Sequence, residues 1–87
     1  MYCVYILKCL DKTLYTGITN NLERRISEHN SSQLGAKYTR GRRPVKLIYS
    51  LQVKSRSVAL KEEYRIKKLL RADKIKLIKS KKYERTK

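Results

Sequence analysis

The sequence predicts a small α/β (α+β) domain in which a three-stranded antiparallel sheet is flanked by helices, in the order ββαβαα. Two short apolar runs near the N-terminus are separated by a few polar residues, which is typical of a hairpin. A third run, at 45–53, alternates between apolar and polar side chains, as a strand does. Stretches with apolar residues at helical spacing follow the hairpin and the third run, so strands and helices are expected to share one core.

The first strand is expected at residues 2–9, YCVYILKC, which are apolar on both alternating faces. A strand with this pattern is covered on both sides and is central in its sheet. Residues 14–19, LYTGIT, are rich in β-branched and aromatic types and suit a second strand. Asp11, Lys12 and Thr13 are predicted to form the hairpin loop between them.

Tyr5, Tyr15 and Gly17 fall on these two strands. A three-residue loop at 11–13 would place all three on one face, whereas a two-residue loop would split them across the sheet, and the sequence leaves both registers open. All seven aromatic residues of the chain are tyrosines, although core filling would more often use phenylalanine, which has no hydroxyl to satisfy. Gly17 weakens a strand, so we expect a ligand or another backbone to pass close to it.

Three helices complete the predicted fold. Residues suited to N-caps precede two of them: Asn20 or Asn21 before the first, and Ser55 or Ser57 before the second. The second helix is expected to run to about Leu70, and the last to cover about residues 72 to 79.

The first helix places charge beside its apolar side. Arg25 and His29 lie four positions apart, at the margin of the stripe formed by Leu22 and Ile26. An arginine there can clamp a phosphate, and a histidine can accept or deliver a proton near neutral pH. The alternative is that Arg25 only snorkels to solvent and that His29 only ends the helix.

The second helix carries a carboxylate in its apolar face. Ala59, Ile66 and Leu70 share that face by their spacing. Glu63 lies within it, whereas Glu62 faces nearer to solvent. Burying an ionised carboxylate without a partner is costly, so Glu63 must meet a cation, a proton or a metal. A structural ion pair with an arginine is the alternative to a metal site.

Residues 30–44 are a loop by composition, and the third strand follows at 45–53. The alternating strand residues are expected to face one way: Val45, Leu47, Tyr49, Leu51 and Val53. The loop interleaves cations with one aromatic side chain: Lys37, Tyr38, Arg40, Arg42 and Arg43. This combination suits a phosphate track with one stacking surface, and a solvated basic loop explains it equally well.

Charge is the strongest compositional signal, because the formal net charge is +16, from 23 basic and 7 acidic residues. Self-repulsion of this size opposes compaction unless a polyanion relieves it. Nucleic acid is the predicted partner, since neutralised phosphates release counterions. A membrane surface is the competing partner, but a basic tail alone would suit it, and here the basic residues run through the whole chain.

The 87 residues fit one domain with a modest core, which we place at 1–80, followed by a basic C-terminal tail at 81–87. No apolar run approaches the ~20 residues of a membrane span, and the first residues do not resemble a signal peptide, so a cytoplasmic location is expected. Cys3 and Cys9 would lie roughly 20 Å apart on one strand, too far for a disulfide, so both are expected to be reduced.

Several stretches of the sequence match the motifs of one known protein family, in the same order along the chain. The first motif is Cys3-Val4-Tyr5 and the second is Tyr15-Thr16-Gly17. The stretch ITNNLERRISEHN is similar to the segment that carries a catalytic arginine, and ALKEEYRIKKL to the helix that holds a metal-binding glutamate. The stretch AKYTRGRRPVKLIYS is similar to a segment found in members of this family that consist of the single domain alone. On these motifs the chain, from residue 2 to about 80, resembles the GIY-YIG nuclease superfamily, and most closely its small stand-alone bacterial members.

The resemblance implies hydrolysis of phosphodiester bonds in DNA, with RNA left open, by one divalent ion, Mg²⁺ or Mn²⁺. Glu63 would hold the ion, which would stabilise the leaving 3′ oxygen. Arg25 would neutralise charge growing on the phosphate. Tyr15 or Tyr5 would position or deprotonate the attacking water, with His29 as a proton relay. The implied catalytic set is Tyr5, Tyr15, Gly17, Arg25, His29 and Glu63, and the implied nucleic-acid-binding set is Lys37, Tyr38, Arg40, Arg42 and Arg43.

The leading hypothesis is therefore a metal-dependent endonuclease, selective for nicked, branched or otherwise distorted DNA. The chain departs from the family pattern at Ile18, where some members carry a lysine near the catalytic tyrosine. The alternative is a non-catalytic nucleic-acid-binding module on the same fold, which predicts salt-sensitive binding without cleavage. A third hypothesis is an interaction protein whose basic face docks on an acidic partner.

Overall fold

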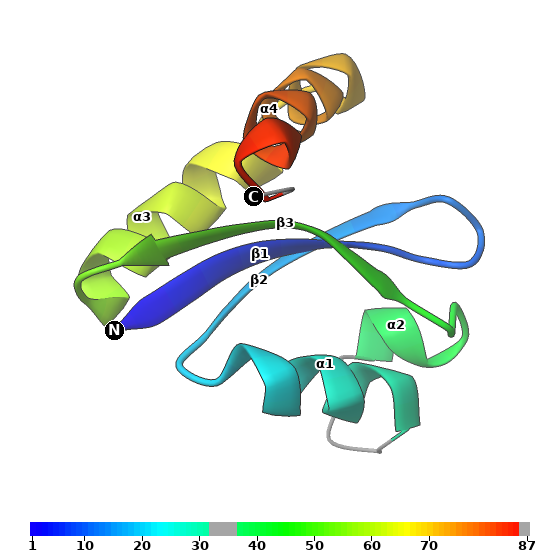
Figure 1. The fold of residues 1–87 in the computed structure, drawn as a ribbon. Helices are drawn as coiled ribbons and strands as arrows, with labels where there is room; N and C mark the ends of the chain where they lie inside the picture. The colour runs from blue at the N-terminus through cyan, green and yellow to red at the C-terminus, as the bar shows by residue number, and fades with distance from the viewer. Residues whose placement is uncertain (32–36, 86–87) are drawn as a thin grey trace.

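The computed structural model shows a three-stranded antiparallel sheet with helices on both faces (Figure 1), as the sequence predicts. It describes residues 1–31 and 37–85, with side chains for all of these except 37 and 81–85. The elements follow the order β1 (Tyr2–Lys8), β2 (Leu14–Thr19), α1 (Leu22–Ser31), α2 (Lys37–Arg40), β3 (Lys46–Val53), α3 (Arg56–Lys67) and α4 (Arg71–Arg85). The short α2 lies in the segment that was expected to be a loop, and the rest of the order is confirmed.

β1 is the central strand, because the strands are arranged β2-β1-β3. Val4 and Ile6 are fully buried on one face, and Tyr5 and Leu7 are buried on the other. The apolar pattern on both faces of this segment therefore has its predicted physical cause, which is that helices cover the sheet on both sides.

The β1–β2 hairpin settles the register that the sequence left open. Tyr5 is paired with Gly17, and Leu7 with Tyr15, so the two tyrosines and the glycine share one face of the sheet. The connection spans residues 9–13 and is longer than the predicted loop at 11–13. It is closed by a hydrogen bond from the Cys9 amide to the Thr13 carbonyl, 2.9 Å. A five-residue connection preserves the face of each residue because it has the same parity as a three-residue one.

β3 contains a register shift that the sequence analysis missed. Ile6 is paired with Tyr49 but Leu7 is paired with Leu47, so Ile48 is an extra residue in the ladder. Leu47 and Val45 therefore pack on the Tyr5 face, whereas Tyr49, Leu51 and Val53 pack on the Val4 face. The prediction that 45, 47, 49, 51 and 53 all face one way is wrong, because the bulge divides this strand between two cores.

The helix starts match the predicted capping residues. Asn21 caps α1, its side-chain Oδ1 accepting from the Arg24 amide at 3.1 Å. Ser55 caps α3, its hydroxyl accepting from the Val58 amide at 3.3 Å. α3 ends at Lys67, so the expected end near residue 70 was too late.

Leu70 is 74% exposed and does not belong to the buried face of α3, contrary to the prediction. It lies in the short connection before α4, and its carbonyl accepts the Lys74 amide at 3.0 Å as α4 begins. The helix α4 extends to Arg85, beyond the predicted end at residue 79. Within the part of the chain that the structure describes, no helix is long and apolar enough to cross a bilayer.

The helices form two layers with different contents (Figure 1). α1 and α2 lie on the sheet face that carries Tyr5 and Leu7, with Leu22 and Ile26 packed against these residues. α3 and α4 lie on the opposite face, where the fully buried side chains are aliphatic apart from Tyr49: Val4, Ile6, Ala59 and Ile66. The two layers share the central strand.

Candidate active site

Gly17 makes room for the tyrosine that lies across from it. A Cβ atom at this position would lie 2.6 Å from the Tyr5 hydroxyl oxygen, 2.7 Å from its Cζ and 3.2 Å from Cε2 of Tyr15. We expected a ligand or another backbone close to this glycine, and the neighbour is instead the pair of tyrosine side chains. Glycine at 17 therefore fixes where the phenol of Tyr5 can sit.

His29 is fully buried beneath these tyrosines. Its Nε2 lies 2.9 Å from the hydroxyl oxygen of Tyr5, and its Nδ1 lies 2.9 Å from the hydroxyl oxygen of Thr39. Edge contacts join its ring to Tyr5 and Tyr15, with centroid separations of 5.9 Å and 5.3 Å. The histidine therefore links both strands to α2 and does more than end its helix.

Two contacts hold the end of α1, and with it His29, in place. Arg43 donates from Nε to the carbonyl of His29 and from Nη2 to the carbonyl of Glu28, 3.3 Å. Asn30 exchanges two hydrogen bonds with the backbone of Val45, at 3.2 Å and 2.7 Å. The segment before β3 is therefore fastened to α1, and Arg43 is used within the fold.

Arg25 brings a positive charge to the same place. Its side chain is partly buried, pairs with the Glu28 carboxylate at 2.9 Å and hydrogen-bonds the hydroxyl of Tyr5. Burial opposes the charged guanidinium, but the hydrogen bonds to Glu28 and Tyr5 more than offset it and raise the pKa of Arg25. The preceding Arg24 is much more exposed, at 61%, and meets Glu28 only at 3.7 Å.

Burial keeps the Tyr5–His29 pair neutral. Desolvation, reinforced by Tyr15, raises the pKa of Tyr5 to about 12, although Arg25 opposes this shift. Desolvation and then the Arg25 charge lower the pKa of His29 to about 4. With Arg25 donating to the Tyr5 oxygen, the consistent arrangement has the Tyr5 hydroxyl donating to Nε2 and the Nδ1–H donating to Thr39. Tyr5 is thus already committed to partners inside the protein.

Tyr15 differs from Tyr5 in this respect. Its ring lies 6.5 Å from the Tyr5 ring and 5.7 Å from the Tyr38 ring, centroid to centroid, and its side chain is partly exposed. Among residues 1–31 and 37–85, the Tyr15 hydroxyl has no hydrogen-bond partner. This phenol is therefore the one that can meet a water molecule or a substrate.

Glu63 approaches the site from the other layer. α3 packs against β2 and β1 on the opposite face, yet the Glu63 charge is close enough to contribute to the raised pKa of Tyr5. Its carboxylate is 20% exposed and pairs with Lys67 at 3.3 Å, so its partner is a lysine of the same helix and not an arginine. Glu62 is 24% exposed and pairs with Arg65, so the expected contrast in exposure is small.

Glu63 suits a magnesium-type ion only if waters and substrate supply the remaining ligands. The described residues contain no group of three or more histidine, cysteine, aspartate or glutamate side chains that could hold a metal. Mg²⁺ is commonly bound by one or two carboxylates, substrate phosphates and several waters, so a single half-buried carboxylate fits that pattern. The ion pair between the Lys67 ammonium and the Glu63 carboxylate would have to break when a metal ion binds.

The basic segment places one aromatic–cation pair beside the site. Tyr38 is 38% exposed, and the Arg42 guanidinium lies 4.1 Å from its ring centroid. Arg42 is fixed by Asp11, at 3.0 Å, and by the Tyr38 carbonyl, at 2.8 Å. Arg40 is exposed on α2, while the Lys37 side chain lies outside the described residues.

Ile18 does not lie on the tyrosine face. Its side chain packs against the Val4 and Ile6 core on the α3 side, because neighbouring residues of β2 point to opposite sides of the sheet. A lysine at 18 would therefore extend toward the α3 layer, whereas the cation that hydrogen-bonds the Tyr5 hydroxyl is Arg25.

Sequence reasoning missed Thr39 and Asn30. Thr39 is fully buried and supplies the second partner of His29, and Asn30 fastens α1 to the start of β3. Neither carries a local signal, because the segment around Thr39 has no apolar periodicity that would predict burial. The pairing of Asn30 depends on a contact 15 residues away in the chain.

Comparison with known proteins gives consistent matches. The family model described as the GIY-YIG catalytic domain matches residues 1–83. A UPF0213 protein from Syntrophus aciditrophicus (strain SB) is 60% identical over 76 residues, covering 87% of both chains. A UPF0213 protein from Clostridium perfringens is 58% identical over 81 residues, covering 93% of this chain and 86% of that protein.

Two solved structures share the fold. The solution NMR structure of a UPF0213 protein from Bacillus halodurans is 44% identical, with a TM-score of 0.63, and the match covers 99% of this chain and 94% of that one. The solution NMR structure of a protein from E. faecalis is also 44% identical with a TM-score of 0.63, covering 91% and 83%.

Proposed function

This chain belongs to the GIY-YIG catalytic-domain family, and we propose that it is a divalent-metal-dependent endonuclease that hydrolyses phosphodiester bonds in DNA. The observation that carries the proposal is the meeting of Arg25, Tyr15 and the buried Tyr5–His29 pair at one sheet face. A guanidinium, together with a phenol that has no hydrogen-bond partner in the described part of the chain, can hold a phosphate and orient the water that attacks it.

In the proposed reaction, Tyr15 positions the attacking water and accepts one of its protons, while its own phenolic proton passes to solvent, as the new bond to phosphorus forms. The bond from phosphorus to the 3′ oxygen breaks, and the leaving oxygen takes up a proton from solvent. Arg25 offsets the negative charge that grows on the phosphate oxygens. Glu63 would hold the divalent ion, Mg²⁺ or Mn²⁺, which when bound supplies Lewis-acid stabilisation of the leaving oxygen.

Tyr5, His29 and Thr39 act in this scheme by positioning. The hydrogen bond that His29 donates to Thr39 and the one that it accepts from Tyr5 fix the Tyr5 oxygen, to which Arg25 donates. An arginine held on one side by Tyr5 and on the other by Glu28 loses little freedom when a phosphate binds.

The first test is plasmid cleavage in Mn²⁺ and in EDTA. Wild-type protein should nick or linearise supercoiled DNA only with the metal, and Glu63→Gln should reduce cleavage by at least about 100-fold if the ion supplies several kcal/mol. Glu62→Gln is the matched control, because Glu62 has similar exposure on the same helix and should leave cleavage nearly unchanged. Cleavage that persists in EDTA, or that survives Glu63→Gln, would refute the metal role. A panel of linear, nicked and branched DNA tests structure selectivity.

The second candidate function is a nucleic-acid-binding module that does not cleave. It was favoured by the isoleucine at 18 together with the high charge, but that side chain packs against the core on the opposite face of the sheet. We therefore place the nuclease proposal first. Salt-sensitive DNA binding without cleavage under any divalent metal would reverse this order.

A further inference from the structure

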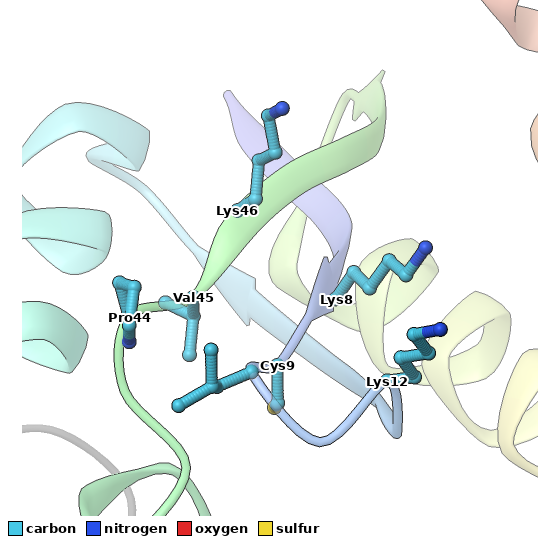
Figure 2. Close-up of a pocket in the computed structure, with 7 residues that line it drawn as sticks. Lys8, Cys9, Lys12, Pro44, Val45 and Lys46 are labelled. Atoms are coloured by element: carbon cyan, nitrogen blue, oxygen red, sulfur yellow. The ribbon is translucent and has the colours of Figure 1, made fainter.

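The β1–β2 connection lies beside the segment that enters β3. Figure 2 shows Cys9 and Val45 where these two segments meet, and both residues belong to one buried cluster. The Leu10 amide donates to the Arg42 carbonyl at 2.9 Å, so the two segments are also joined through their backbones. The lysine side chains of the two segments extend away from this contact: Lys8, Lys12 and Lys46.

Hydrogen bonds hold the β1–β2 connection at several points. The Cys9 amide donates to the Thr13 carbonyl, and the Lys12 amide donates to the Cys9 carbonyl, each at 2.9 Å. From the start of α4, Arg71 donates to the Lys12 carbonyl at 2.9 Å. Asp11 therefore projects from a loop whose own backbone is fixed.

Both carboxylate oxygens of Asp11 are used within the protein. Oδ1 accepts from the Thr13 hydroxyl at 2.6 Å and from the Thr13 amide at 3.1 Å. Oδ2 accepts from Nε of Arg42 at 3.0 Å. The hydrogen bonds from Thr13 and then from Arg42 lower the pKa of Asp11 below its ordinary value, so the carboxylate is charged at neutral pH.

Arg42 connects this carboxylate to α2. Its backbone amide donates to the Thr39 carbonyl at 3.0 Å. Its side chain, held at Nε by Asp11, donates from Nη1 to the Tyr38 carbonyl at 2.8 Å. The same guanidinium lies 4.1 Å from the centroid of the Tyr38 ring. Asp11 and Arg42 therefore fix the place of both the backbone and the ring of Tyr38.

The direction of the Tyr15 hydroxyl depends on ring contacts, because it has no hydrogen-bond partner in the described part of the chain. Its ring meets those of Tyr5, His29 and Tyr38, with centroid separations of 6.5, 5.3 and 5.7 Å. Tyr5 and His29 are buried and are fixed by the hydrogen bond between them. Tyr38 is 38% exposed, and it is Arg42 that holds its ring in place.

We propose that Asp11 and Arg42 form a positioning pair, which holds Tyr38 against Tyr15 and so sets the direction in which the Tyr15 hydroxyl meets the attacking water; the inference rests on the proposed function. Arg42 then acts inside the protein, in place of the phosphate contact that its basic segment suggests. The side chains of Asp11 and Arg42 are 47% and 38% exposed, and an ion pair with such exposure contributes little to global stability. Breaking it should therefore change the rate of cleavage more than the melting temperature.

Asp11→Asn tests the pair, because a positioning role and bulk charge predict opposite effects. Asparagine keeps the oxygen that accepts from Thr13 but turns an amide NH₂ group toward the N–H of Arg42. The single-turnover rate of cleavage at saturating DNA should fall about tenfold, since a small displacement of a reacting group is costly. The affinity for a short fluorescein-labelled DNA in EDTA should be equal or higher, since a negative charge is removed.

Asp73→Asn is the matched control for that variant. It removes the same charge from an exposed position in the first turn of α4 and should leave the rate of cleavage nearly unchanged. An unchanged or faster rate for Asp11→Asn, or an equal loss of rate in both variants, would overturn the proposal.

Two substitutions of Arg42 separate positioning from a phosphate contact. Lysine keeps the positive charge but lacks the planar fork that joins Asp11 to the Tyr38 carbonyl. Arg42→Lys should therefore slow cleavage about as much as Arg42→Gln, and neither should change the salt dependence of DNA binding. A salt slope that falls by about 1 in Arg42→Gln but not in Arg42→Lys would identify a phosphate contact and overturn the proposal.

A double-mutant cycle tests whether the pair acts through Tyr38. In a Tyr38→Ala background, Asp11→Asn should cause little further loss of rate, because the ring that the pair holds is absent. Losses that multiply in the double variant would show that Asp11 acts by another route, against the proposal.

NMR of the free protein tests the pair without DNA or metal. Nuclear Overhauser contacts between the rings of Tyr15 and Tyr38 should weaken in Asp11→Asn, whereas those between Tyr15 and His29 should persist. Identical contacts in the variant and the wild type would overturn the positioning pair. If the contacts weaken as expected but the wild-type protein never cleaves DNA, the proposed function fails and the pair that holds Tyr38 still stands.

Discussion

The two faces of the sheet differ in what the side chains of the central strand contact. On the α3 and α4 side, Val4 and Ile6 meet a core that is aliphatic apart from Tyr49 and the buried hydroxyl of Thr16. On the α1 and α2 side, Tyr5 from the same strand meets the buried polar residues His29 and Thr39. A buried polar group costs free energy unless it is paired, so each face sets a different requirement. One face provides stability through packing, and the other holds functional groups in a fixed arrangement.

The largest effect that we expect from a single substitution is a loss of DNA cleavage on the tyrosine face, and it tests whether this face holds the functional groups. Arg25→Ala should lower the single-turnover rate of DNA cleavage by about 100-fold to 1,000-fold, because it removes the charge that stabilises the phosphate in the transition state. Arg24→Ala is the control, since its side chain is 61% exposed on the same helix. If both variants lose activity equally, the arginines act only through bulk charge and the site assignment fails.

The second effect is a dependence of stability on pH that belongs to the tyrosine face alone. The pKa of His29 is about 4 in the folded protein, below the ordinary 6.5, mainly because the ring is buried. The unfolded chain therefore binds the extra proton first, so this contribution is complete above about pH 6.5 and is lost as the pH falls toward 4. It amounts to about 3 kcal/mol at most.

Urea unfolding at several pH values between 4 and 7.5 measures this dependence. His29→Gln should be less stable than wild type at pH 7.5 and should show a smaller loss of stability on acidification. Carboxylates contribute to both proteins, so the difference between the two curves isolates the histidine. Parallel curves would show that His29 titrates as an ordinary exposed imidazole.

The smallest effects come from making one substitution on each face. Thr16 lies on the α3 side, and its hydroxyl is buried with no hydrogen-bond partner in the described part of the chain. Thr16→Val should therefore raise the free energy of unfolding by about 1 kcal/mol, whereas Thr39→Val, which strands the Nδ1 of His29, should lower it by about 1–3 kcal/mol. Thermal or urea unfolding of the two variants measures both. Shifts of the same sign would contradict the contrast between the faces.

The sequence predicted those parts of the fold that depend on local pattern. β1 is apolar on both faces because both faces are covered, and Asn21 and Ser55 cap helices at the expected places. It failed at β3, where Ile48 is an extra residue. Alternating apolar residues look the same whether or not a bulge moves them between faces, so no pattern in this segment could reveal the shift.

The sequence could predict which residues belong to the candidate site better than it could predict the contacts between them. Spacing placed His29 beside Arg25, but it could not show that His29 contacts Tyr5 and Thr39, because these contacts join segments 24 and 10 residues away. It also treated Tyr5 and Tyr15 as equivalent. Their difference comes from burial and hydrogen bonding in three dimensions. Tyr5 is bonded to His29 and Arg25, whereas the Tyr15 hydroxyl has no hydrogen-bond partner among residues 1–31 and 37–85.

The bulge at Ile48 affects how the two layers of the protein can unfold. Because β3 changes sides there, its first residues are anchored to the tyrosine layer and its later residues to the aliphatic layer. Neither layer can detach without pulling on a strand that the other layer also holds. Local opening of the site should therefore be as rare as global unfolding. In a hydrogen-exchange experiment, the amide protons of β1 on either side of Ile6 should show the same free energy of opening.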